Sequence, residues 1–229
     1  EQVIDAIQKL ARLAPLHNPI NLKGILSAQK HFPALENVAV FDTAFHQTLP
    51  SRAKTYAIDQ KIALKHGLKR YGFHGTSHEY VVHKAAEYLK ADLKNLRIIS
   101  CHLGNGCSIA AVEFGKSVET TMGLSPLEGL VMGTRSGDLD PGLILFLQKN
   151  ENWTIDELDT FLNKKCGLLG LSGKTNDMRE IIDAATAGDE PAQLALAVFC
   201  HRLKKYIGAY AAVMGGVDAV IFTGGIGEN

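Results

Sequence analysis

Residues 99–112 read ISCHLGNGCSIAAV. Two apolar, β-prone runs flank the polar and glycine-containing sequence HLGNG. Asn-Gly between two apolar runs is a strong signal for a two-stranded hairpin. Small residues would also let the backbone approach a bulky charged group such as a phosphate. The motif alone leaves both interpretations open.

Further strands are predicted around this hairpin. The apolar pattern predicts strands over 97–102, 107–114 and 117–122, with a tight turn at Gly115-Lys116. Near the end of the chain, VDAVIFTGGIGEN predicts a buried strand followed by a glycine turn, and NVAVFDTAF at 37–45 predicts another buried strand. Because such strands are interspersed with helical segments, the sequence predicts an α/β fold with a mixed sheet flanked by helices.

Helical periodicity and capping residues predict most of the other elements. Thr76 with Glu79 and Thr154 with Glu157 fit the capping box that begins a helix. A further helix start is predicted at Ser125. The predicted helices are 1–14, 21–31, 53–66 with Gly67 as its C-cap, 76–90, 140–149, 154–165, 177–187 and 190–214, and CGLLGLSGKTND at 166–177 is predicted as a loop.

The composition excludes several classes of function. The chain has 229 residues, 46% of them hydrophobic, which suffices for one large domain or two smaller ones. Lys plus Arg and Asp plus Glu each number 24, so no net charge would attract nucleic acid or an acidic membrane. The longest apolar run, 192–214, is interrupted by charged residues, so we expect no membrane-spanning helix and no signal peptide. The four cysteines form no C-x-x-C pair, which predicts reduced thiols and a cytoplasmic protein.

Glycine turns that directly follow apolar strands are candidate phosphate contacts. HLGNG at 102–106 and TGGIGEN at 223–229 each follow one. In open α/β sheets, ligands bind beyond the carboxyl ends of strands, where glycines let backbone N–H groups face phosphate oxygens. Each turn could also be an ordinary connection. Arg135, in GTRSGD, suits a phosphate or carboxylate through its planar guanidinium, and the alternative is a surface loop arginine.

His74 and Asp42 are the other candidates. His74, in HGTSH, is either satisfied by a backbone partner or donates a hydrogen bond to a charge that develops in a transition state. The capping box places His74 before the helix, so its ring need not share a face with His78, which argues against zinc. Asp42 follows an apolar run, where a carboxylate caps a turn, is paired, binds a metal or takes part in chemistry. Glycine turns with an arginine, a histidine, an asparagine and an acid, without an obvious nucleophile, are what phosphoryl transfer requires.

Seven motifs follow one another along the chain: APLHNP, FDTAFHQTLP, YGFHGTSHEYV, HLGNGCS, GLSPLEGLVMGTRSGDLDPG, SGKTNDMRE and FTGGIGEN. Each is weak alone, but the set closely resembles the acetate kinase (acetokinase) family. The resemblance implies the ribonuclease-H-like, actin-like ATPase fold of the acetate and sugar kinase/Hsp70/actin superfamily. Residues 1–45 would be the tail of the first domain, and 46–229 most of the second, nucleotide-binding and dimerisation domain. The implied homodimer transfers the γ-phosphoryl group of ATP to acetate in line, with Mg²⁺, giving acetyl phosphate and ADP.

The resemblance also implies roles for individual residues. Asp42 would lie near the metal and the phosphates, although the resemblance does not assign it as a metal ligand. His74 and Arg135 would stabilise the transferring phosphoryl group. Asn105 would lie closest to the transfer. From the residues alone, Asp177 is explained as a helix start. The implied nucleotide-binding residues are His102, Leu103, Gly104, Asn105, Gly106, Asp177, Met178, Arg179, Gly225, Ile226, Gly227, Glu228 and Asn229, and Leu16, Phe73 and Pro126 would form the methyl pocket of the substrate.

The chain departs from the family pattern at both ends, because the family's amino-terminal phosphate and metal motif, a second substrate arginine and a carboxy-terminal metal-binding glutamate have no counterpart. We therefore expect a truncated piece that is inactive alone. Propionate or butyrate kinase shares these motifs and is an alternative. A non-catalytic nucleotide-binding or dimerisation lobe is another, and in that case the apolar helix 192–214 could be either core or interface.

Overall fold

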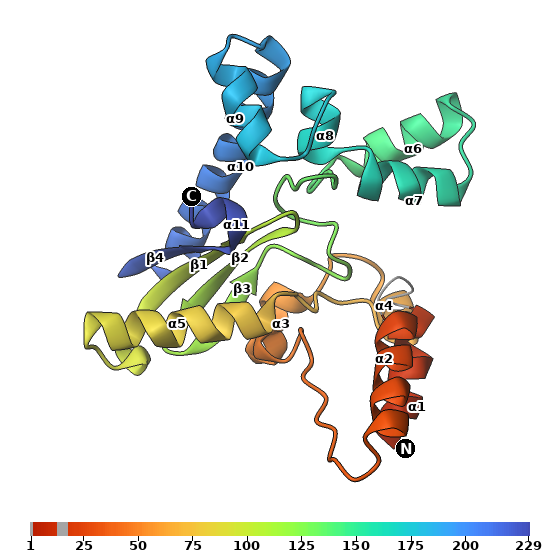
Figure 1. Ribbon diagram of the computed structural model, residues 1–229, viewed down its shortest axis with the longest axis vertical. Helices are drawn as coiled ribbons and strands as arrows, with labels where there is room; N and C mark the ends of the chain where they lie inside the picture. The colour runs from red at the N-terminus through yellow and green to blue at the C-terminus, as the bar shows by residue number, and fades with distance from the viewer. Residues whose placement is uncertain (1, 13–17) are drawn as a thin grey trace. The chain divides into compact units, whose positions relative to one another are not determined.

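The computed structural model describes residues 2–12 and 18–229 (Figure 1). By their internal contacts these residues divide into two compact units, one up to Phe41 and one from Asp42 to Asn229. The assignment of 1–45 and 46–229 to two ribonuclease-H-like domains stays a prediction. Of the predicted site residues, Leu16 lies outside the described residues, and all others belong to the second unit.

The first unit is a helical pair. Helix α1 (Gln2–Lys9) continues into a short 3-10 turn (Leu10–Arg12), and α2 spans Asn18–His31. The side chain of Asn18 donates to the backbone carbonyl of Ile7 at 3.2 Å, which ties the two helices together. The predicted strand at 37–45 is wrong. Val38 and Val40 are 84% and 74% exposed, and no strand among the described residues supplies the backbone partners that an extended segment requires.

The second unit is built on a four-stranded mixed sheet in the order β3-β2-β1-β4. Strands β1 (Arg97–Leu103), β2 (Cys107–Glu113) and β3 (Lys116–Thr120) are antiparallel neighbours, which confirms the three predicted strands. The turn between β2 and β3 lies one residue earlier than predicted, at Phe114 and Gly115, both with positive φ. Strand β4 (Ala219–Thr223) pairs in parallel with β1, so the two glycine turns leave the same edge of the sheet.

The two faces of the sheet are covered by different helices. Ile98, Ala110 and Val112 pack with Val82 and Ala86 of α5 (Gly75–Leu89). The alternate residues face α8 (Gly167–Ser172), α9 (Met178–Thr186) and α10 (Glu190–Met214), and Figure 1 shows α5 and α10 on opposite sides of the sheet. Each fully buried large apolar side chain contributes about 1.5–3 kcal/mol, which makes this sandwich the core of the unit.

Several helix predictions are corrected at their boundaries. The predicted helix 53–66 is two helices, α3 (Ser51–Lys54) and α4 (Gln60–His66), because the Asp59 carboxylate caps a new start at the amides of Lys61 and Ile62. Gly67 ends α4 with a φ of 69°, as predicted. Residues 167–172 of the predicted loop form α8, because the amide of Leu168 donates to the backbone carbonyl of Met132 at 2.8 Å.

The capping box at Thr76 is also wrong. Helix α5 begins at Gly75, after His74 in the left-handed conformation with a φ of 56°. Asp42 supplies the cap from elsewhere in the chain: its carboxylate accepts from the amide of His74 at 2.9 Å, and its carbonyl accepts from the amide of Gly75 at 2.8 Å. A Cβ at Gly75 would lie 2.4 Å from that carbonyl oxygen, so only glycine fits.

No helix begins at Ser125, and residues 123–140 run as an irregular segment. Glu128 does not cap a helix, because Arg70 and Tyr56 bind its carboxylate, the former at 2.6 Å. The other end of the segment is fixed by Asp138, which accepts from the amide of Gly129 at 2.8 Å and from the Tyr206 hydroxyl.

The remaining helices agree with the sequence. The N-caps Asp140, Thr154 and Asp177 begin α6 (Pro141–Asn150), α7 (Ile155–Lys164) and α9, and the capping box of α7 is present. Helix α10 has the predicted bounds and ends at Gly215, and the short helix α11 (Gly224–Gly227) stands where a glycine turn was predicted. Short 3-10 turns lie at Phe45–Thr48 and Leu93–Asn95. Within 2–12 and 18–229, no helix is long and apolar enough to cross a membrane.

Candidate active site

The sequence HLGNG forms the tip of the β1–β2 hairpin, as its turn signal predicts. The amide of Gly104 donates to the carbonyl of Gly106 at 3.1 Å and closes the tip. Asn105 projects there: its side-chain oxygen accepts from Asn176 at 2.8 Å, and its backbone oxygen accepts from the amide of Gly133 at 2.9 Å. A Cβ at Gly133 would lie 2.0 Å from the Asn105 side-chain oxygen. Sequence reasoning missed Asn176 and Gly133, because their importance depends on this meeting of distant segments.

Arg135 and His74 approach the same point beside the tip. A Cβ built on Gly106 would lie 3.4 Å from Nη1 of Arg135 and 3.6 Å from Nε2 of His74. Nη1 of Arg135 also donates to the carbonyl of Pro126 at 3.2 Å. No carboxylate among the described residues forms an ion pair with Arg135. Burial lowers the pKa of Arg135, yet a guanidinium stays charged near neutral pH, so its charge is available to an anion.

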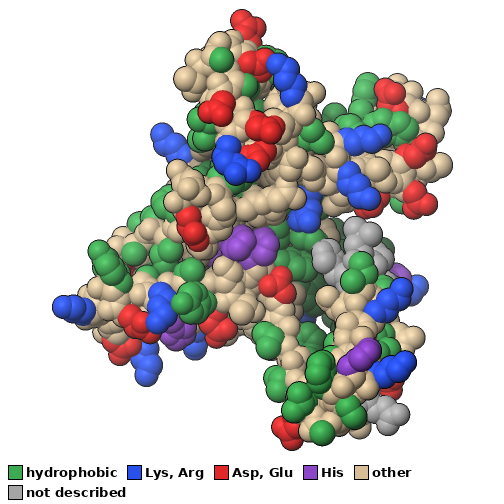
Figure 2. All heavy atoms as spheres, in the orientation of Figure 1, with side chains coloured by type: hydrophobic (Ala, Val, Ile, Leu, Met, Phe, Trp, Pro, Cys, Tyr) green, Lys and Arg blue, Asp and Glu red, His purple; other side chains and the backbone are tan. Residues whose placement is uncertain are grey.

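His74 belongs to a group of four histidines with His46, His78 and His102. The His74 ring stacks on that of His102 with centroids 4.1 Å apart, and the His74 and His78 rings lie 6.5 Å apart. His74 precedes the helix, as predicted, yet its ring and that of His78 both bind the hydroxyl of Ser108. Figure 2 shows histidine side chains gathered in the middle of the visible face. His46 gave no signal in the sequence beyond its residue type.

Burial keeps these histidines neutral. It lowers the pKa of His74 to about 4, with a further lowering from the nearby His102, against a smaller opposing effect of Asp42. Burial likewise lowers the pKa of His46 and His102, and that of His78 falls well below its ordinary value. A neutral imidazole beside a charged guanidinium offers one hydrogen-bond donor and one full positive charge to an anionic oxygen.

A pocket of about 940 Å³ opens beside the hairpin tip and gathers most of the predicted nucleotide-binding residues. Its apolar wall includes Leu196 and Phe199 of α10 and Phe222 of β4. Arg179 and Asp177 form an ion pair at 2.6 Å on its rim, and this pairing lowers the pKa of Asp177 to about 2. The predicted residues that line the pocket are Leu103, Gly104, Asn105, Asp177, Met178, Arg179, Gly225, Ile226, Gly227 and Asn229; His102, Gly106 and Glu228 do not line it.

Two of the predicted methyl-pocket residues lie close to the charged centre. Phe73 is half-buried against the core, and its carbonyl accepts a hydrogen bond from His46 at 3.0 Å. Pro126 is also half-buried and binds Arg135 through its carbonyl. The third residue, Leu16, lies outside the described residues.

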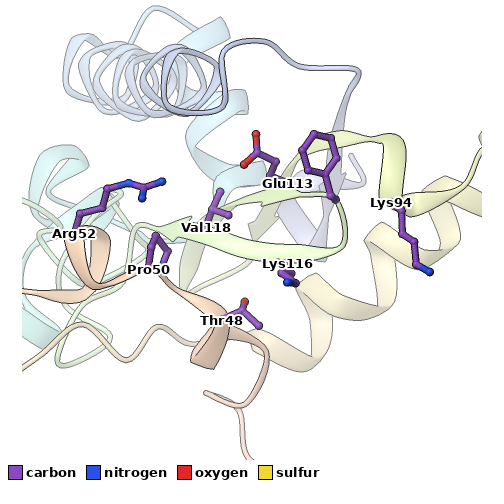
Figure 3. A pocket seen from close by; sticks show the side chains of 8 residues that line it. Thr48, Pro50, Arg52, Lys94, Glu113, Lys116 and Val118 are labelled. Atoms are coloured by element: carbon purple, nitrogen blue, oxygen red, sulfur yellow. The ribbon is translucent and has the colours of Figure 1, made fainter.

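A second pocket lies at the turn that joins β2 to β3, near Phe114. It measures about 470 Å³ and is lined by Arg52, Lys94 and Lys116 beside Glu113. Figure 3 shows Arg52 and Lys94 on opposite sides of this pocket, with the Lys94 side chain directed away from Arg52. These cations do not converge on one point, and no predicted site residue lines the pocket.

Comparison with known proteins agrees with this fold. The mixed sheet flanked by helices places the chain in the actin-like ATPase class, because it superposes closely on solved acetate kinases. The chain belongs to the Acetokinase family, whose model matches residues 1–229. It is 56% identical to an acetate kinase from Caldicellulosiruptor saccharolyticus over 229 residues, which are 100% of this chain and 57% of that protein.

Two solved structures show the same likeness. The crystal structure of Porphyromonas gingivalis acetate kinase matches with a TM-score of 0.96 and 51% identity, over 100% of this chain and 57% of that one. A propionate kinase from Francisella tularensis matches with a TM-score of 0.95 and 50% identity, over 99% of this chain and 58% of that one. The chain thus spans somewhat more than half the length of the relatives it matches.

Proposed function

We propose that the full-length protein carrying this chain is an acetate kinase, which transfers the γ-phosphoryl group of ATP to acetate and yields acetyl phosphate and ADP. The observation that carries this proposal is the pair formed by Arg135 and His74, which both flank Gly106 beside the large pocket. Arg135 is charged and has no carboxylate partner among the described residues, and His74 is neutral. The family and the names of the relatives support the same reaction.

In this proposal the reaction is a direct in-line transfer. An acetate oxygen attacks the γ-phosphorus as the bond to the ADP oxygen breaks. Arg135 and His74 stabilise negative charge on the equatorial oxygens, since catalysis of phosphoryl transfer is mainly positioning and charge stabilisation. Asn105 lies between these groups and the large pocket. We assign this pocket to ADP or ATP, with the phosphates at the hairpin tip and the adenosine against the apolar wall.

Mg²⁺ fits the donor set at Asp42. Oδ2 of Asp42 accepts from the amide of His74 at 2.9 Å, and Oδ1 has no hydrogen-bond partner among the described residues. Mg²⁺ is commonly bound by one or two carboxylates together with substrate phosphates. No group of three or more His, Cys, Asp and Glu in the described part of the chain could hold a metal by itself. Asp42 would therefore hold Mg²⁺ beside bound phosphates, where the ion supplies neutralising charge.

Propionate kinase is the second candidate, because the Francisella tularensis propionate kinase matches almost as well as the acetate kinase. The test is ATP-dependent acyl phosphate formation by the full-length protein with acetate, propionate and butyrate. We expect the highest kcat/KM with acetate. A higher value with propionate or butyrate would shift the assignment to that acid, and no acyl phosphate from any of the three would refute the proposal.

A cytoplasmic homodimer is part of the same proposal. Exposed apolar side chains at the end of α10 and on β4, including Val213 and Val220, leave surface for a second copy. Sedimentation of the full-length protein tests this assembly: we expect a dimer, and a monomer at all concentrations would contradict it.

A further inference from the structure

A buried chain of polar side chains connects the sheet to His74. The Ser100 hydroxyl lies 2.8 Å from Nδ1 of His78, and Nε2 of His78 lies 2.8 Å from the Ser108 hydroxyl. The Ser108 hydroxyl in turn lies 2.9 Å from Nδ1 of His74. Ser100, His78 and Ser108 are fully buried, so water does not compete for these bonds.

The first member sets the direction of the chain. The only hydrogen-bond partner of the Ser100 hydroxyl among the described residues is Nδ1 of His78. A buried hydroxyl proton without an acceptor is costly, so Ser100 donates to His78. His78 is neutral and its remaining proton is then on Nε2, which donates to the Ser108 oxygen.

The same logic fixes the proton of His74. Because the Ser108 oxygen accepts from His78, its own proton is donated to Nδ1 of His74. Neutral His74 then has its proton on Nε2, the nitrogen beside Gly106 and Arg135. The reverse direction would leave the proton of the buried Ser100 hydroxyl without an acceptor, because Nδ1 of His78 is its only partner among the described residues.

We propose that Ser100, His78 and Ser108 are positioning residues, which hold His74 in the tautomer whose Nε2–H is donated to an anionic oxygen beside Arg135. The proposal deepens the proposed function and rests on it for the identity of that oxygen, which belongs to the transferring phosphoryl group. Arg135 supplies the charge, and His74 supplies a directed donor.

The surroundings of His74 favour this division of roles. The titratable and charged groups that face it are Asp42, His46, His78, His102 and Arg135. Protonation of Nδ1 would place a second cation beside Arg135 and would set an N–H against the proton of Ser108. It would therefore require the whole chain of hydrogen bonds to reverse.

His46 provides an internal comparison. Its Nε2 donates to the carbonyl of Phe73 at 3.0 Å, so its Nδ1 accepts from the hydroxyl of Ser117 at 2.8 Å. Ser117 and His46 are therefore also a buried serine bound to a neutral histidine. Their hydrogen bonds, however, end on a backbone carbonyl and do not reach His74. Ser117→Ala is therefore a matched control for Ser108→Ala.

The test is nitrogen NMR of the full-length protein with ¹⁵N-labelled histidine. In the unchanged protein we expect a pyrrole-type signal for Nε2 of His74 and a pyridine-type signal for Nδ1. Ser108→Ala should give a mixture of tautomers, a higher pKa for His74 and a turnover about fivefold lower at unchanged nucleotide KM. Ser108→Cys, which keeps a weak donor, should be intermediate, and Ser117→Ala should leave the His74 signals unchanged.

Two results would overturn the proposal: a His74 proton on Nδ1 in the unchanged protein, or the same His74 signals in Ser108→Ala and Ser117→Ala. The first needs no variant to fold. The tautomer is measured without catalysis, so failure of the proposed function is separable: it would show as absent phosphoryl transfer in an unchanged protein whose His74 still has its proton on Nε2.

Discussion

The β1–β2 hairpin and the irregular segment 123–140 both supply residues to the candidate site, but different forces hold them. The hairpin is a ladder of neighbouring backbone pairs, from Arg97 opposite Glu113 to Leu103 opposite Cys107. The segment has no such ladder. Arg70 fixes its entry by donating to the carbonyls of Thr120, Thr121 and Met122, and Asp138 fixes its exit.

This difference predicts where a single substitution should have the larger effect on structure. A hairpin in which most backbone groups are paired tolerates the loss of one side chain at its tip without losing its shape. The segment depends on a few side chains that come from distant parts of the chain. Substitutions in the segment or at its anchors should therefore cost more than substitutions at the hairpin tip.

The largest effect is expected at Arg135 in the segment. Arg135→Ala in the full-length protein should lower kcat about 10³-fold while changing nucleotide affinity little, because the charge acts on the transferring group. Arg52→Ala removes the same charge from the exposed rim of the second pocket and should leave kcat unchanged. Steady-state kinetics of both variants checks this, and a loss below tenfold for Arg135→Ala would refute its role.

The anchor Arg70 should come next. Arg70→Ala removes donors to three carbonyls and to Glu128, most of them buried, and should lower the free energy of unfolding by about 3 kcal/mol. Lys84→Ala breaks an exposed ion pair with Glu87 and should leave the free energy of unfolding nearly unchanged. Urea unfolding of both variants measures this. Equal shifts would show that the segment does not depend on its anchor.

The buried histidines should make stability depend on pH. The pKa of His74 falls from 6.5 to about 4 on folding, so between these values the unfolded state binds more protons. The free energy of unfolding should therefore be highest above pH 6.5 and fall toward pH 4, by about 3 kcal/mol from His74. Thermal unfolding against pH measures the slope, and His74→Asn, which tolerates the left-handed conformation, should reduce it. An unchanged slope in that variant would contradict the burial of a neutral His74.

The smallest effect is expected where the two regions touch. Gly133→Ala places a Cβ 2.0 Å from the Asn105 side-chain oxygen and should lower turnover about tenfold by displacing Asn105. Gly208→Ala, inside α10 with nothing within 4 Å of the new Cβ, should keep full activity and gain up to about 1 kcal/mol of stability. Steady-state kinetics and urea unfolding compare the two glycine variants. Equal activities would show that the position of Asn105 does not affect turnover.

The same comparison explains what the sequence could predict. Strands β1 to β3, helix α10 and the capping box of α7 follow from local periodicity and local caps, so they were predicted almost residue for residue. The start of α5 was predicted wrongly because Asp42, which is distant in sequence, caps the helix at His74. The helix predicted at Ser125 does not form, and Glu128 binds Arg70 and Tyr56 instead of capping it.

The candidate site divides in the same way. The glycines of HLGNG and the guanidinium of Arg135 stand out as residue types in a pattern, and the family resemblance adds the nucleotide-binding residues. The Ser100, His78 and Ser108 chain could not be predicted, because its members come from two strands and a helix and meet only through the register of the sheet. Asn176 is another such residue.

The hairpin tip and the large pocket are assigned to the nucleotide. Calorimetric titration of Mg²⁺-ADP into the full-length protein and its Asn105→Ala variant tests this assignment. We predict saturable binding to the unchanged protein with an affinity about tenfold weaker in the variant, since one polar contact to the phosphates is lost. Equal affinities in the two proteins, or no binding to a protein that melts cooperatively, would contradict the assignment.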